Sequence, residues 1–253
     1  MKGKISNKII YYDEVDSTQK IAKELISSGN SEHGLVICAK TQTEGIGRLD
    51  RKWISPIGGL WITTIYQGEF PLELFQGFSV FLGMEIADRL EKEFHLEFKI
   101  KWPNDLILNN KKIGGILIDI ISQQDNINYL IIGIGINLNV RLEDLPTELS
   151  NYTTSLLIEQ NYIVDLDDIL NVIIETQNDT FEKSFHERNI DIWGNWPKKS
   201  FTYNTEVVVD IFDEKVIGIE KGITSKGELV ISFETGETRK ISAGEIQLLR
   251  KSN

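Results

Sequence analysis

The chain has 253 residues, in which 27 Lys and Arg are outnumbered by 38 Asp and Glu, giving a formal net charge of −11. That acidic balance argues against broad binding to nucleic acid or to an anionic membrane surface. Hydrophobic residues make up 41% of the chain, enough for a buried core, which excludes a disordered or collagen-like protein.

The single cysteine, Cys38, cannot form an internal disulfide, which fits a reducing cytoplasm. Its apolar neighbours favour a buried, unreactive thiol. The longest apolar runs, such as residues 129–136, are much shorter than the roughly 18–20 residues of a membrane-spanning helix. The N-terminus lacks the apolar core and the cleavage site of a signal peptide. We therefore expect a cytoplasmic protein with no membrane partner.

The first predicted elements are three strands and one helix. Residues 8–12 are apolar and β-branched, and further strands are expected at 35–41 and 60–66. After the first strand, Ser17 has the character of a helix N-cap, and Gly29 is expected to close that helix.

Two long helices are predicted at 72–94 and 166–185, where apolar residues recur at helical spacing. Four strands are expected between these helices, at 98–101, 106–108, 112–121 and 129–138. Residues 109–111 are typical of a hairpin connection. Because successive strands lack intervening helices, we predict an α+β fold, a mixed or antiparallel sheet with helices packed against it.

The pattern changes near residue 197 to short strands joined by turn-like segments. These strands are predicted at 206–212, 216–224, 228–233 and 237–241. About 50 residues of this kind indicate a small β-barrel. The predicted domains are residues 1–200 and residues 201–253.

The segment 42–59 is a long loop without periodicity, which indicates a functional or mobile segment. It contains Gln42-Thr-Glu-Gly-Ile-Gly-Arg-Leu-Asp-Arg-Lys-Trp53. Its glycines let backbone N–H groups approach an anion, while Arg48, Arg51 and Lys52 concentrate positive charge. These residues favour a phosphate or carboxylate site over a solvated basic loop.

A second pattern is Lys101-Trp102-Pro103-Asn104-Asp105. Asn104 and Asp105 offer oxygen ligands of the kind Mg²⁺ prefers, and Trp102 offers a flat surface for a ring. Taken alone, however, the segment is more typical of a turn with Trp102 in the core.

A third pattern places Lys112 in an apolar strand, shortly before Gly115. A poorly hydrated lysine is costly unless an anion lies beside it, so Lys112 is a candidate for chemistry, whereas Lys111 fits a hairpin tip.

The run Gly133-Ile-Gly135-Ile-Asn137 puts paired glycines into a buried strand, which suggests close approach by a ligand or another backbone. It lacks the third glycine and the following helix of a Rossmann fingerprint, and the chain has no P-loop. Three scattered histidines, His33, His95 and His186, predict no metal cluster.

Together these motifs closely resemble those of biotin–protein ligases in order and spacing. The matching segments are residues 16–19, 42–56, 101–105, 112–117 and 133–137. The β-rich tail resembles more loosely the family's C-terminal SH3-like barrel. The resemblance implies a core fold like that of class II aminoacyl-tRNA synthetases and a homodimer.

The resemblance also implies a two-step reaction that uses ATP, biotin and Mg²⁺. Biotin is first activated to biotinyl-5'-AMP and then transferred to one lysine on the biotin carboxyl carrier domain of a biotin-dependent carboxylase. The expected catalytic residues are Arg48 and Lys112.

The resemblance carries ligand-binding roles over to further positions. Biotin-binding residues are expected at Ser17, Thr18, Gln19, Gln42, Gly45, Ile46, Gly47, Arg48, Lys112, Gly115 and Gly133. ATP- or adenylate-binding residues are expected at Arg48, Arg51, Lys52, Trp53, Asn104 and Asn137. Asp105 is the expected Mg²⁺ ligand.

Two departures from the family pattern concern the loop, where Ile46 and Asp50 replace an Arg and a Gly. A side-chain phosphate contact at position 46 is therefore lost. Because the segment 16–19 comes early, no room precedes it for the winged helix that some members carry, so a monofunctional enzyme without a DNA partner is expected. The alternatives are a non-catalytic biotin or adenylate sensor, and a lipoate–protein ligase.

Overall fold

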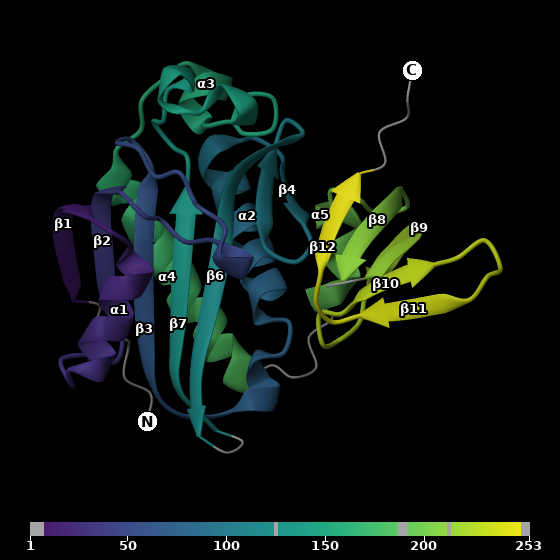
Figure 1. The fold of residues 1–253 in the computed structure, drawn as a ribbon, viewed down its shortest axis with the longest axis horizontal. Helices are drawn as coiled ribbons and strands as arrows, with labels where there is room; N and C mark the ends of the chain where they lie inside the picture. The colour runs from purple at the N-terminus through teal and green to yellow at the C-terminus, as the bar shows by residue number, and fades with distance from the viewer. Residues whose placement is uncertain (1–7, 124–125, 187–191, 212–213, 249–253) are drawn as a thin grey trace. The chain divides into compact units, whose positions relative to one another are not determined.

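The computed structural model describes residues 8–123, 126–186, 192–211 and 214–248. Within them the chain forms two compact units, residues 8–74 with 111–179, and residues 75–110 with 180–248. The predicted α+β class is confirmed, as Figure 1 shows. Among the described helices, none has both the length and the apolar character needed to cross a membrane.

The first unit contains five neighbouring strands in the order β1-β2-β3-β7-β6. Their bounds are Ile9–Val15 (β1), Leu35–Gln42 (β2), Leu60–Pro71 (β3), Lys111–Gln123 (β6) and Asn126–Ile136 (β7). β1 and β2 run parallel and the other neighbours antiparallel, so the predicted mixed sheet is confirmed. β3 is longer than predicted, because residues 67–71 continue to pair with β7.

Helices α1 (Thr18–Ser27) and α4 (Leu166–His186) lie on opposite faces of these strands, α1 in front and α4 behind in Figure 1. Ala22 of α1 packs with Leu35, Ile37, Ile65 and Ile131 in one buried cluster. On the other face, Thr64 of β3 donates a hydrogen bond of 3.0 Å to Gln177 of α4. The predicted N-cap is confirmed, since the Ser17 hydroxyl accepts from the Gln19 N–H.

The second unit contains helix α2 (Phe78–Phe94), helix α5 (Trp196–Lys199) and the antiparallel pair β4 (Phe98–Lys101) and β5 (Asp105–Leu108). The prediction of one helix over 72–94 is wrong at its start. Residues 72–75 form a separate 3₁₀ turn, η2 (Leu72–Phe75), and Gly77 has a left-handed φ of +71°, so α2 begins only at Phe78. The spacing of apolar residues is helical on both sides of this break, so the sequence pattern did not reveal it.

The C-terminal part of the second unit is an antiparallel sheet in the order β11-β10-β9-β8-β12. The strands are Glu206–Ile211 (β8), Glu214–Ile223 (β9), Leu229–Ser232 (β10), Thr238–Ile241 (β11) and Glu245–Leu248 (β12). Four of them were predicted. The fifth, β12, was missed; it pairs with β8 at one edge of the sheet.

Trp102 is 1% exposed, so its interpretation as a core residue is correct. Its indole N–H donates a hydrogen bond of 2.9 Å to the carbonyl of Gly227, in the turn between β9 and β10. Gly227 also packs against Gly77, where a β-carbon built on Gly227 would lie 2.5 Å from the Cα of Gly77. The turn is therefore tied to the start of α2 and to the segment 101–105 within this unit.

The remaining elements are short. They are η1 (Arg48–Asp50), η3 (Leu142–Asp144), η4 (Thr147–Leu149), α3 (Leu156–Gln160) and η5 (Ile192–Asn195). Cys38, on β2, is partly buried, and burial raises the pKa of its thiol to about 11. This disfavours the reactive thiolate at neutral pH, in agreement with the sequence-based expectation.

Candidate active site

On the α1-facing side of the first unit, three glycines leave part of the sheet without side chains. We call Gly115, Gly133 and Gly135 the glycine strip. Thr63 on β3 is paired with Gly133 on β7, which is paired with Leu117 on β6. In the next such row, Gly135 is paired with both Trp61 and Gly115. Glycines 115, 133 and 135 are partly buried, whereas the neighbouring Ile116 and Ile134, on the opposite face, are fully buried. Because glycine has no side chain, other groups can lie directly against the backbone of this strip.

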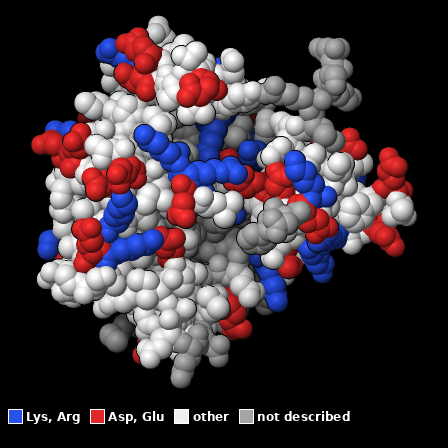
Figure 2. All heavy atoms as spheres, viewed as in Figure 1, with Lys and Arg blue, Asp and Glu red and all other residues white. Residues whose placement is uncertain are grey.

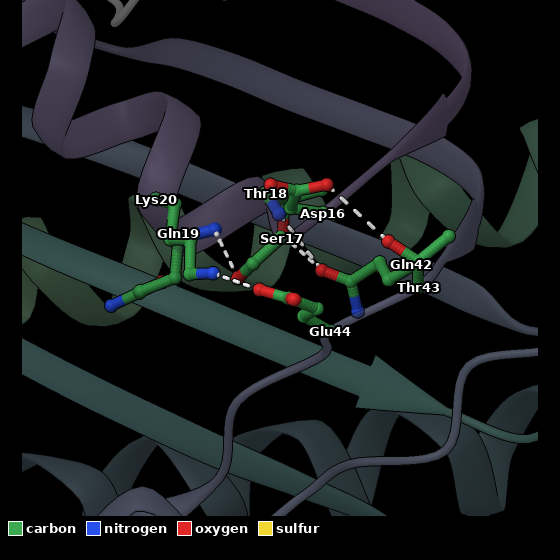
Figure 3. A network of polar contacts seen from close by, with 8 residues as sticks. All are labelled: Asp16, Ser17, Thr18, Gln19, Lys20, Gln42, Thr43 and Glu44. Atoms are coloured by element: carbon green, nitrogen blue, oxygen red, sulfur yellow. Dashed lines mark hydrogen bonds and ion pairs between the residues drawn. The ribbon is translucent and has the colours of Figure 1, made fainter.

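The N-terminus of α1 and the end of β2 meet in a network of hydrogen bonds beside this strip (Figure 3). The Thr18 N–H donates to Gln42 Oε1 at 2.8 Å, and the Thr18 hydroxyl lies 3.2 Å from the same oxygen. Gln42 Nε2 in turn donates to the Ser55 hydroxyl at 2.8 Å. Ser17, Thr18 and Gln19 are at most 4% exposed, so all three are held in fixed positions.

Gln19 joins this network to the sheet. Its Nε2 faces two acceptors, Asp119 Oδ2 at 3.2 Å and the carbonyl of Ile131 at 3.5 Å. Its Oε1 lies 3.0 Å from the Thr63 hydroxyl. A β-carbon at position 133 would lie only 2.7 Å from Gln19 Oε1, so Gly133 makes room for the carboxamide. We call Ser17, Thr18, Gln19, Gln42 and Thr63 the polar cluster.

The loop after β2 is an ordered hairpin. Gln42 is bridged to Ser55, and Ile46 to Lys52, by isolated antiparallel contacts. The Trp53 N–H donates to the Gly45 carbonyl at 2.8 Å. A side chain at position 45 would place its β-carbon 2.4 Å from the carbonyl oxygen of Trp53, so only glycine fits there.

The tip of this loop contains two consecutive residues with left-handed backbone, Leu49 with φ 54° and Asp50 with φ 56°. Non-glycine residues adopt this region at a cost. The tip is closed by hydrogen bonds from the Gly47 N–H to the Arg51 carbonyl, at 2.7 Å, and from the Arg51 N–H to the Arg48 carbonyl, at 3.2 Å. Both arginines are thus placed at the two ends of η1.

Lys112 and Trp53 form the second feature of the site. The Lys112 ammonium lies 4.8 Å from the centroid of the Trp53 ring, a cation–π arrangement. The indole lies over the glycines, since a β-carbon at 135 would be 2.6 Å from Trp53 Nε1 and one at 115 would be 3.5 Å from the ring. Trp61 supports it edge-on at 6.4 Å between centroids.

The Trp53 indole N–H is buried and has no hydrogen-bond partner among the described residues. A buried donor without an acceptor is costly, which is consistent with a position that a ligand completes. The first unit therefore combines a polar cluster, a bare glycine strip and a lysine held over an aromatic ring.

Comparison with known proteins identifies the family to which the chain belongs. Residues 11–137 match the family model described as biotin/lipoate A/B protein ligase family, and residues 204–249 match the biotin protein ligase C terminal domain. The chain belongs to the biotin protein ligase family. This confirms the resemblance inferred from the sequence.

Individual relatives agree with the family assignment. The chain is 30% identical over 241 residues to the bifunctional ligase/repressor BirA of Bacillus spizizenii, covering 95% of this chain and 74% of that protein. It is 24% identical over 230 residues to the biotin--[acetyl-CoA-carboxylase] ligase of Mycobacterium tuberculosis, covering 88% and 82%. The biotin protein ligase of Aquifex aeolicus, solved with biotin and ATP, superimposes with a TM-score of 0.82 at 31% identity, covering 96% and 99%.

Most positions expected from the biotin ligase resemblance are gathered in the first unit. The polar cluster contains Ser17, Thr18, Gln19 and Gln42, and Gly133 lies beneath it. The Lys112 ammonium lies over Trp53, and a β-carbon built on Gly115 would lie 3.5 Å from the Trp53 ring and 3.6 Å from Lys112 Cε.

Asn137 is buried and bound to protein backbone. Its Nδ2 donates to the Thr154 carbonyl at 2.9 Å, and its N–H to the Ile113 carbonyl at 2.8 Å. These bonds tie the end of β7 to neighbouring segments. A role toward adenylate stays a prediction.

Asn104 and Asp105 lie in the second unit, at the start of β5. Asp105 forms an ion pair of 3.5 Å with Lys101. Among the described residues, no group of three or more His, Cys, Asp or Glu side chains could hold a metal ion. A magnesium ion carried by one carboxylate and by substrate phosphates needs no such group, so the donor chemistry of Asp105 fits the expected ion.

Two lysines of α1 form ion pairs beside the site. On the face drawn in Figure 2, basic side chains are interspersed with acidic ones. Lys20 of α1 is paired with Glu44 of the loop, and this contact raises the pKa of Lys20 and lowers that of Glu44. Lys23 is paired with Asp119 at 2.5 Å.

Two site positions were not assigned from the sequence, Thr63 and Asp119, whereas Gly135 belongs to the glycine pair for which the sequence predicted close approach by a ligand or another backbone. Thr63, like its neighbour Thr64, is 0% exposed in β3, and Asp119 is the one acidic residue in the apolar run 113–121. A polar residue within a strand could have indicated each of these positions. Their hydrogen-bond partner, Gln19, is however far away in the chain.

Proposed function

We propose that this protein is an ATP-dependent biotin–protein ligase. It activates biotin to biotinyl-5'-AMP and then transfers biotin to a lysine of the biotin carboxyl carrier domain of a biotin-dependent carboxylase. The observation that carries this proposal is the lysine of the first unit, Lys112, held over Trp53 at the edge of the glycine strip. The ligase activities of the relatives named above support it.

The polar cluster suits the ureido ring of biotin. That ring offers two N–H donors and one carbonyl, and Ser17, Thr18 and Gln19 offer fixed donors and acceptors at the N-terminus of α1. Such a buried polar cluster discriminates strongly against ligands that leave its groups unpaired. Gly133 makes room for the Gln19 carboxamide, which would bind this ring, and Gly115 makes room for Trp53 and Lys112.

The charge that builds during activation is met by Lys112 and Arg48. A carboxylate oxygen of biotin attacks the α-phosphorus of ATP, the bond to the bridging oxygen breaks, and pyrophosphate leaves. Fixed cationic donors at such a centre contribute about 10²–10³ in rate each. In the second step the carrier lysine amine attacks the acyl carbon, AMP leaves, and the amine loses a proton.

The remaining assignments belong to the same proposal. Gln42 and the backbone of residues 45–47 line biotin and adenylate, while Arg51, Lys52, Trp53, Asn104 and Asn137 bind the nucleotide. Asp105 is the proposed ligand for Mg²⁺, which neutralises phosphate charge when bound. A homodimer and a cytoplasmic location are part of the proposal.

The test is mass spectrometry of a biotin carboxyl carrier domain incubated with the protein, Mg²⁺-ATP and biotin, with lipoate in a parallel reaction. The expected result is a mass gain of one biotin, lost in Lys112→Ala but retained in the neighbouring Lys111→Ala. Transfer of lipoate instead would mean that the protein is a lipoate ligase. Saturable biotin binding without pyrophosphate release or transfer would identify a sensor.

A further inference from the structure

We propose that Asn137 is a positioning residue that holds Lys112 in place through residues 152–154, which we call the brace. The proposal rests on the proposed function, in which the Lys112 ammonium meets the carboxylate of biotin. It is separate from the nucleotide contact assigned to Asn137 above, because it concerns the bonds of Asn137 to the protein itself.

The first step is that the main chain of Lys112 is bound by the brace. The pairing of β6 with β7 begins at Gly114, two residues after Lys112. At Lys112 the brace lies parallel to β6. The Lys112 N–H donates to the Tyr152 carbonyl at 2.8 Å, and the Lys112 carbonyl accepts from the Thr154 N–H at 2.9 Å. Both main-chain polar groups of this lysine are therefore bound by the brace.

The second step is that Asn137 binds both β6 and the brace. Its side-chain Nδ2 donates to the Thr154 carbonyl at 2.9 Å, and its main-chain N–H donates to the Ile113 carbonyl at 2.8 Å. Its own carbonyl accepts from the N–H of Leu156, just after the brace, at 3.1 Å. Asn137 therefore joins the strand that contains Lys112 to the segment that binds Lys112.

The third step concerns the loss of the side-chain bond. Asn137 is 3% exposed and Thr154 is 0% exposed. An alanine at position 137 would take this donor away from a carbonyl in the interior, which is costly. The brace is then expected to shift, and Lys112 moves with it because two bonds join them. A misplacement of about 1 Å is enough to weaken the contact of a charged group with its ligand.

The experiment measures by calorimetry how strongly the protein prefers biotin to biotin amide, in which a neutral carboxamide replaces the carboxylate. No nucleotide is present, so a contact of Asn137 with adenylate cannot affect the result. Wild type is expected to prefer biotin at least tenfold, because Lys112 meets the carboxylate. Asn137→Ala and Asn137→Ser are each expected to reduce this preference at least threefold, while their affinity for biotin amide stays within twofold of that of wild type.

Two further variants serve as controls. Asn139 likewise donates from Nδ2 to a main-chain carbonyl, that of Val164 at 2.8 Å, and the bonds described for it lead to Val164 and Gly58 instead of the brace. Asn139→Ala is therefore expected to keep the preference of wild type. Lys112→Ala removes the cation, so adding Asn137→Ala to it is expected to change the remaining preference by less than 1.5-fold.

Three results overturn the proposal and leave the proposed function intact. If both Asn137 variants weaken biotin and biotin amide by the same factor, or Asn139→Ala lowers the preference equally, Asn137 only supports the fold. If the preference is absent from wild type or unchanged in the Asn137 variants, Asn137 has no part in placing the charge. If Asn137→Ala lowers the preference as much without Lys112 as with it, Asn137 does not act through this lysine. A wild-type protein that binds neither ligand would overturn the proposed function as well.

Discussion

Gly77 and Gly227 meet backbone to backbone in the second unit, with left-handed φ values of +71° and +73°. A β-carbon on Gly227 would lie 2.5 Å from Gly77 Cα, and one on Gly77 would lie 2.8 Å from Gly227 Cα. Because both neighbours are main chain, neither can move aside as a flexible side chain would. This contact brings the β9–β10 turn close enough for the Gly227 carbonyl to accept the Trp102 indole N–H.

Gly227→Ala is therefore expected to lower the free energy of unfolding by about 2 kcal/mol more than Gly236→Ala. Gly236 is the matched control, since its φ of +85° is also left-handed but nothing lies within 4 Å of its added β-carbon. Urea denaturation followed by far-UV circular dichroism measures both variants. Equal losses would mean that the close approach to Gly77 contributes nothing beyond backbone strain.

Arg48→Gly is expected to release the adenylate before transfer, because it removes a fixed cation from the proposed adenylate site. The freed mixed anhydride would acylate amines at random, so a bystander protein in the reaction gains biotin. Mass spectrometry of the bystander measures this. Arg141→Gly, the same change at an exposed arginine paired with Glu143, serves as control. A variant at Arg48 that stays active and labels only the carrier domain would contradict this role.

Asp50→Gly is expected to be more stable than Asp50→Ala by about 1 kcal/mol, because only glycine occupies a left-handed φ of 56° without steric cost. Both variants remove the same charge, so the comparison isolates the backbone. Thermal and urea denaturation at neutral pH give the difference. Identical stabilities would show that the loop tip leaves this conformation in solution.

Glu220 supplies a pH-dependent prediction. It is fully buried, and its carboxylate accepts from Trp196 Nε1 at 2.8 Å, from the Ser200 hydroxyl at 2.7 Å and from the Thr202 hydroxyl. Burial raises the pKa of this carboxyl above its ordinary value, although the three hydrogen bonds act in the opposite direction. The folded state therefore holds its proton more tightly than the unfolded state.

Stability linked to Glu220 is therefore present below the unfolded-state pKa and is lost as the pH rises through the folded-state pKa. Glu220→Gln resembles the protonated form and cannot titrate, so its stability should not depend on this group. As the pH rises over that range, the free energy of unfolding of wild type should therefore fall relative to that of Glu220→Gln. Denaturation at a series of pH values measures it. The same replacement at exposed Glu206 should leave the profile unchanged. A constant difference between wild type and Glu220→Gln would refute the linkage.

Local sequence signals were sufficient for most elements of the fold. Ser17 was recognisable as an N-cap because its hydroxyl acts on residues two positions away. The start of α2 was misplaced because Phe75 belongs to the same apolar periodicity and is itself buried, while the break depends on the backbone of Gly77. Helical periodicity reports which residues are buried, and it does not report where the hydrogen bonds of the helix begin.

The candidate site was predictable as a set of motifs but not as a network. Family resemblance placed Gln19 and Gly133 in it, yet only the paired strands show that Gly133 makes room for the Gln19 carboxamide. Asp119 and Thr63 contact Gln19 across 100 and 44 residues of chain, respectively. Such contacts follow from strand register, which a single sequence specifies only weakly.

The hairpin form of the loop after β2 has a kinetic consequence. Bridges from Gln42 to Ser55 and from Ile46 to Lys52 already fix most of its backbone before any ligand arrives. Ordering a free loop of this length would cost about 1–2 kcal/mol for each residue. Because the hairpin is preformed, little conformational entropy is lost when a ligand binds beside it. Amide hydrogens such as those of Gly47 and Trp53 should therefore exchange slowly with solvent even in the absence of ligand.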